Sequence, residues 1–96
     1  MEEEKILTLH PEEGKQGVNI SRAKYEMIRQ AILNAIRSQG SISFQGLVSL
    51  IDYSLRNRFE GSISWYVTTV KLDLEARGDI ERAPGSGEQH LRLTKK

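Results

Sequence analysis

Apolar residues recur at intervals of three and four positions along the first half of the chain. The run consists of Tyr25, Ile28, Ile32, Ala35 and Ile36. This spacing places all of them on one face of an α-helix. Ser21 precedes the run and can accept a hydrogen bond from a backbone N–H of the first turn, and Gly40 follows it, where helices commonly end. We expect a helix over about residues 21–39, with Ile20 packed on Tyr25 as a hydrophobic staple.

Two further runs with the same spacing follow. The first consists of Phe44, Leu47, Val48, Ile51 and Leu55. The second consists of Ile63, Val67, Val70 and Leu74. Ser43 and Ser62 precede these runs and are suited to be N-caps of a second and a third helix. Gly78 can end the third helix in a left-handed conformation, after which Ile80 would fold back on Leu74.

The remaining apolar stretches are short and predict strands. Ile6–Leu9 and Val18–Ile20 are separated by turn-forming residues, so residues 1–20 form either a small β-hairpin or an extended arm. Ile80–Ala83 and Gln89–Thr94 flank the sequence Pro-Gly-Ser-Gly, which predicts a two-stranded ribbon.

Together these elements define the expected architecture. Ser41–Ser43 is long enough only for a strand of one bridge. The order is therefore helix, short strand, helix, helix, hairpin. We expect an α+β fold, mainly α, with an N-terminal arm over residues 1–20 and one domain over residues 21–96.

This order of elements resembles the winged helix-turn-helix superfamily. Residues 63–82 are similar to the end of its third helix and the start of its wing, with Leu74 four residues before Gly78 and Ile80 opening the strand. A narrower resemblance is to a group of small uncharacterised bacterial winged-helix proteins. It rests on the sequences Ala-Lys-Tyr-Glu at residues 23–26 and Trp-Tyr-Val-Thr-Thr-Val-Lys-Leu-Asp-Leu-Glu at residues 65–75. That group has no established activity.

The superfamily resemblance implies binding to double-stranded DNA, as in a small transcriptional regulator. In winged helices of this kind the third helix enters the major groove and the wing touches the DNA backbone or the minor groove. The face of the third helix opposite its core would then carry Ser64, Trp65, Thr68, Lys71 and Glu75. The implied DNA-contacting residues are Ser62, Ser64, Thr68, Lys71, Arg82, His90, Arg92 and Lys95.

These residues divide by the part of DNA that each would contact. Ser62 and Ser64 lie at a helix N-terminus, which favours a phosphate. Thr68 and Lys71 would reach base edges. The residues at positions 82, 90, 92 and 95 lie on or beyond the wing and would contact phosphates.

A second stripe on the third helix supports an alternative function. Trp65, Thr69, Leu72 and Ala76 follow helical spacing beside the core stripe. This stripe could pack on the N-terminal arm or on a second subunit. The alternative is therefore a module for protein interaction or homodimerisation, centred on Trp65 and Leu72, because aromatic anchors are typical of interface centres.

The charge of the chain leaves both hypotheses open. Its net charge is +1, divided as −3 over residues 1–20, +3 over residues 21–60 and +1 over residues 61–96. Nucleic-acid-binding domains usually carry a larger basic excess. Arg22 and Lys24 lie in the first turn of the first helix, where the helix dipole disfavours cations, so they either hold an anion or form a solvated face.

Other classes of function are not expected from this sequence. The chain has no cysteine, which excludes disulfides and thiolate zinc sites. His10 and His90 lack partners at metal-ligand spacing, and no nucleophile–base pair or cofactor motif is present, so we expect no enzyme, no metal and no cofactor. No apolar run approaches the ~18–20 residues of a membrane span, and the acidic N-terminus is unlike a signal peptide. We expect a cytoplasmic protein without a membrane partner.

Overall fold

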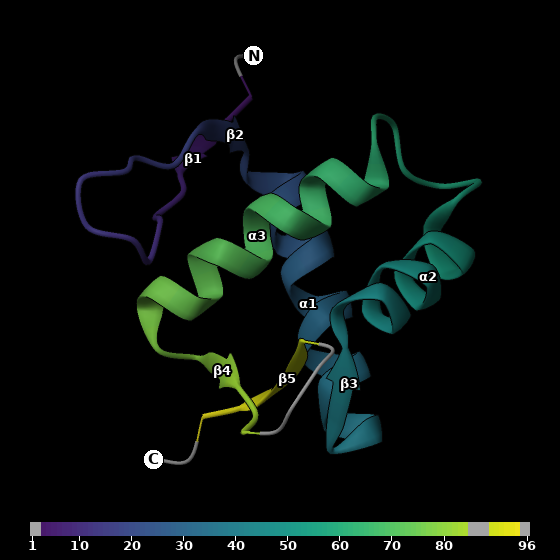
Figure 1. Ribbon diagram of the computed structural model, residues 1–96. Helices are drawn as coiled ribbons and strands as arrows, with labels where there is room; N and C mark the ends of the chain where they lie inside the picture. Colours follow the sequence, from purple (N-terminus) through teal and green to yellow (C-terminus); the bar gives the residue numbers. More distant parts are fainter. Residues whose placement is uncertain (1–2, 85–88, 95–96) are drawn as a thin grey trace.

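The computed structural model describes residues 3–84 and 89–94, as an α+β arrangement of three helices and two small sheets (Figure 1). The helices are α1 (Arg22–Gln39), α2 (Phe44–Leu55) and α3 (Ile63–Arg77). The strands are β1 (Lys5–Leu7), β2 (Asn19–Ser21), β3 (Ser41–Ser43), β4 (Ile80–Arg82) and β5 (His90–Leu93). None of the helices in the described ranges is both long enough and apolar enough to cross a membrane.

The three helices begin where the serine residues predict. The hydroxyl of Ser21 accepts a hydrogen bond from the N–H of Lys24 at 3.2 Å, and that of Ser43 accepts from Gly46 at 3.0 Å. Ser62 accepts from the N–H of Trp65 at 3.3 Å. Each bond satisfies one of the N–H groups that a helix leaves unpaired at its start. The predicted N-caps are therefore confirmed.

The predicted apolar stripes of the helices meet in one core. Its fully buried centre consists of Ile28, Ile32, Ile36, Leu47, Val67, Val70, Leu74 and Leu91. α3 ends at Gly78 in the left-handed conformation that the sequence predicts, with φ 82°. The N–H of Asp79 donates to the carbonyl of Leu74 at 2.9 Å. Ile80, just beyond that glycine, is 2% exposed.

The C-terminal sheet has three strands instead of the two that the sequence predicts. Its order is β3-β5-β4, with both pairs antiparallel. Ser41–Ser43 pairs with β5 over three positions, so the expectation of a single bridge is wrong. The reason lies in the side chains: Ile42 is opposite the fully buried Leu91, and burial of this pair against the core holds the short strand in register.

The N-terminal segment is a hairpin that covers one side of α3. β1 and β2 pair antiparallel, and beyond them the N–H of Thr8 donates to the carbonyl of Val18 at 2.8 Å. The N–H of Leu9 donates to a carboxylate oxygen of Asp73 on α3 at 2.8 Å. In Figure 1, α3 lies between this hairpin on one side and α2 on the other. We refer to residues 3–21 as the arm.

Candidate functional site

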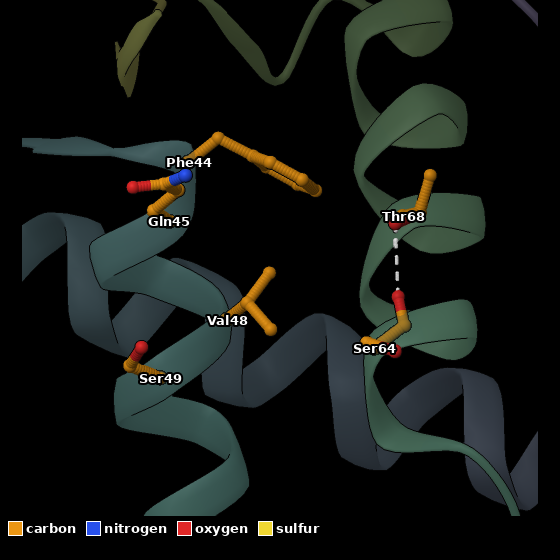
Figure 2. Close-up of a pocket in the computed structure, with 6 residues that line it drawn as sticks. All are labelled: Phe44, Gln45, Val48, Ser49, Ser64 and Thr68. Atoms are coloured by element: carbon orange, nitrogen blue, oxygen red, sulfur yellow. Dashed lines mark hydrogen bonds between the residues drawn. The ribbon is translucent and has the colours of Figure 1, made fainter. Parts of the chain in front are cut away.

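A groove separates α2 from α3 on the face of α3 away from the arm (Figure 2). It has a volume of about 390 Å³ and is lined by Phe44, Gln45, Val48, Ser49, Ser64 and Thr68. Ser64 and Thr68 are exposed, as we predicted for this face of the third helix. The sequence analysis did not single out the two polar residues that α2 contributes, Gln45 and Ser49. They are four positions apart on the side of α2 opposite its core stripe, and this spacing indicates a shared exposed face.

The hydroxyl groups of this groove are already oriented by the helix. Thr68 Oγ1 donates to the backbone carbonyl of Ser64 at 2.9 Å (Figure 2). Its oxygen lone pairs remain available as acceptors. Ser62 Oγ lies 3.4 Å from Ser64 Oγ at the start of the same helix. The groove thus offers neutral hydrogen-bonding groups beside the apolar surfaces of Phe44 and Val48.

Lys71 does not belong to this exposed face. It is 5% exposed, and its Nζ lies 2.6 Å from Oε1 of Glu75 and 5.5 Å from the centroid of the Phe44 ring. Position 71 is four residues after Val67 and three before Leu74, which are both fully buried, so Lys71 shares their side of α3. The prediction of an exposed Lys71 and an exposed Glu75 is therefore wrong.

The described part of the C-terminal hairpin presents a mixed set of charges. The side chain of Arg82 is 67% exposed and its Nε lies 4.0 Å from Glu75. Arg92 is held by Glu81, with Nη2 2.6 Å from Oε2, so its charge is largely balanced. His90 is exposed on β5. Lys95 lies outside the described residues.

The second stripe of α3 faces the arm. Trp65, Thr69 and Leu72 line a pocket of about 140 Å³ together with two arm segments, residues 8–10 and 16–18. Leu72 is half-buried there, while Trp65 stays 46% exposed. The sequence left open whether this stripe packs on the arm or on a second subunit. In the structure of the single chain it lies against the arm.

A buried carboxylate fixes the arm against the helices. Asp73 is fully buried and accepts hydrogen bonds from the hydroxyl of Tyr25 and the N–H of Leu9. Arg77 Nε donates to both oxygens of the same carboxylate, at 3.0 and 2.9 Å. Sequence reasoning missed this centre. Its signal was an aspartate three residues after the core position Val70 and four before an arginine.

Burial of Tyr25 makes the centre sensitive to alkaline pH. Burial, together with the hydrogen bond to Asp73, raises the pKa of Tyr25 from 10.0 to about 12. The neutral phenol is therefore favoured in the folded state, so this stabilisation is complete below pH 10 and is lost as the pH rises towards 12. At about 1.4 kcal/mol per pKa unit, the raised pKa of Tyr25 stabilises the folded state by about 3 kcal/mol, most of which we expect to be lost by pH 12.

The measurement is urea unfolding at several alkaline pH values, with Tyr25→Phe as the control. The variant lacks the phenol and should show a flatter dependence, while deprotonation of lysine affects both proteins alike. Equal slopes for the two proteins between pH 10 and 12 would contradict the assignment.

The cations at the start of α1 interact with a carboxylate and with aromatic rings of the same chain. Nη1 of Arg22 lies 3.1 Å from Oε1 of Glu4, and the Ser21 hydroxyl donates to Glu3. The Nζ of Lys24 lies 5.6 Å from the ring centroid of Phe59 and 5.4 Å from that of Tyr66. The arm therefore supplies carboxylates at the positive end of the α1 dipole, which offsets the cost of the first-turn cations.

These observations define a small α+β domain whose third helix presents two distinct surfaces, one towards α2 and one towards the arm. Within residues 3–84 and 89–94, no three side chains of His, Asp or Glu gather as ligands for a metal ion. The chain belongs to DUF6958, a family of unknown function, whose profile matches residues 5–91. No curated protein and no solved structure gives a significant match.

Proposed function

We propose that this protein is a winged-helix domain that binds double-stranded DNA, as a small regulator would. The observation that carries the proposal is the strand order β3-β5-β4. The strand between α1 and α2 pairs with the returning strand of the C-terminal hairpin, which supports the interpretation of that hairpin as a wing. The resemblance of residues 63–82 to winged helices supports the same assignment.

The proposed contacts are those that remain exposed. Ser62, Ser64 and Thr68 on α3 would hydrogen-bond to phosphates and base edges, and Gln45 from α2 would add an amide, the group that pairs with adenine. Arg82 and His90 would approach the DNA backbone from the wing, together with Arg92 where DNA displaces Glu81. Lys71 is left out, because its buried ammonium is paired with Glu75. Since the only arginines among these proposed contacts are Arg82 and Arg92, we expect weak binding that decreases as the salt concentration rises.

The test is fluorescence anisotropy of labelled mixed-sequence duplex DNA at about 50 and 200 mM salt, where phosphate-driven binding changes most. We expect binding at low salt that collapses at high salt. Arg82→Ala should reduce the slope of log K against log salt by about 0.9, the value for one phosphate contact.

The matched control for this charge removal is Lys15→Ala, on the exposed loop of the arm, where the lysine side chain is 60% exposed. It should leave the slope unchanged. Equal effects of the two substitutions would refute the wing assignment, and absence of binding at both salt concentrations would refute DNA binding itself.

A second candidate function is homodimerisation through the surface around Trp65. The exposure of this side chain favours it, since 46% of a tryptophan remains accessible beside an apolar stripe. In that case light scattering would give a mass that rises with protein concentration for the wild type. The mass of Trp65→Ala would stay that of a single chain.

A further inference from the structure

Exposed apolar side chains are concentrated where the arm meets α3. Seven large apolar residues are exposed in the described ranges, and four of them lie along this seam: Leu7, Leu9, Val18 and Trp65. Isolated exposed apolar residues are normal on protein surfaces, but a contiguous group commonly marks a binding site. The seam is also hollowed, since one pocket lies beside Trp65 and a second beside Leu7.

The pocket beside Trp65 in this seam has room for a small ring. Its volume is about 140 Å³, bounded by Leu9 and Val18 from the arm and by Trp65 and Leu72 from α3. An apolar cavity of about 150 Å³ is known to hold a benzene molecule. A single six-membered ring therefore fits this pocket, which adjoins a second hollow of about 470 Å³ that shares most of its arm residues.

The polar rim of the pocket indicates which substituent the ring would carry. Nδ1 of His10 accepts a hydrogen bond from the N–H of Glu12 at 3.1 Å. In the neutral imidazole the proton then resides on Nε2, which makes this nitrogen a donor. Gln16 adds an amide to the same rim. On the adjacent loop Lys15 Nζ lies 3.0 Å from Oε2 of Glu12, so these two charges balance, while Glu13 adds an exposed carboxylate that disfavours an anionic ligand.

We propose that the seam is a binding site for a small uncharged aromatic molecule that carries a hydrogen-bond acceptor. The ring would pack against Trp65 and Leu72, and its acceptor would take a hydrogen bond from Nε2–H of His10. This site is distinct from the groove proposed for DNA, because it lies on the other side of α3.

The probe for the test is benzyl alcohol, and propanol serves as the same hydroxyl without a ring. Trp65 is the sole tryptophan of the chain, so its fluorescence reports on the site directly. We expect a saturable change in emission with a Kd in the millimolar range, as is reasonable for a ligand of about eight non-hydrogen atoms. Propanol should give no saturable response.

Two neighbouring substitutions form a matched pair. Thr69→Phe fills the pocket and should abolish saturation, whereas Thr68→Phe adds the same ring on the α2 side and should leave saturation intact. His10→Ala, on the exposed loop, removes the donor without altering the helix. It should weaken binding about 2- to 10-fold, the usual effect of one hydrogen bond.

A response that rises linearly without saturation, or one that persists unchanged in Thr69→Phe, would overturn the proposal. If Thr69→Phe fails to fold, an unchanged Kd in His10→Ala would overturn it instead. Light scattering on the same samples distinguishes self-association: a dimer that shields Trp65 and excludes benzyl alcohol would also overturn the proposal. None of these outcomes affects the anisotropy test for DNA.

Discussion

Asp73→Ala is expected to lower the free energy of unfolding by about 3 kcal/mol, a large fraction of the stability of a domain of this size. The substitution leaves the buried hydroxyl of Tyr25 and the N–H of Leu9 without an acceptor. Each unsatisfied buried group costs about 1–3 kcal/mol. The guanidinium of Arg77 is less affected, because its side chain is 37% exposed and water can reach it.

Urea unfolding measures this effect, and Asp52→Ala provides the comparison. Asp52 also pairs with an arginine four residues later, with 3.1 Å between Oδ2 and Nη2 of Arg56, but both side chains are about half exposed. Exposed pairs of this kind contribute about 0.3–0.5 kcal/mol. Similar losses in the two variants would show that Asp73 does not connect the arm to the helices.

Gly17→Ala is expected to displace the arm at a cost of about 2–3 kcal/mol, in the range of overpacked sites. A Cβ at this position would lie 2.0 Å from the backbone carbonyl oxygen of Thr8. Since the obstacle is backbone, no change of rotamer can relieve the contact, and the two sides of the hairpin must separate. The emission of Trp65 should shift to longer wavelength as the arm leaves its surroundings.

Gly14→Ala is the matched control within the same loop. Gly14 has φ 85°, and a Cβ added there would have no atom within 4 Å, so alanine meets only backbone strain of about 1–2 kcal/mol. Its tryptophan emission should match that of the wild type. A Gly17→Ala variant with native emission and a loss below that of Gly14→Ala would show that the hairpin tolerates the separation.

The helices could be predicted from the sequence because their determinants are local. The N-cap serines and the apolar spacing lie within a few residues of each helix, and each predicted start is found within one residue. The sequence alone does not decide whether residues 1–20 form a hairpin or an extended arm. The hydrogen bond that holds this segment against α3 joins Leu9 to Asp73, which is 64 positions later in the chain. No local pattern encodes such a pair.

The candidate site could be predicted only in part for the same reason. Ser64 and Thr68 lie one turn apart on α3, so their shared exposed face follows from helical spacing alone. The opposite wall of the groove depends on how α2 packs against α3. Lys71 was misplaced because lysine is rarely buried, although an acid four residues later was available to pair with it.

The attachment of the arm has a consequence for native-state hydrogen exchange. The N–H groups of Thr8 and Leu9 point to acceptors on Val18 and Asp73, so neither exchanges with solvent until these contacts break. Because few residues of the arm are buried, we expect it to open as a unit at a lower free energy than the three-helix core. Transient opening would expose the buried carboxylate of Asp73 and one side of α3 while the rest of the domain remains folded.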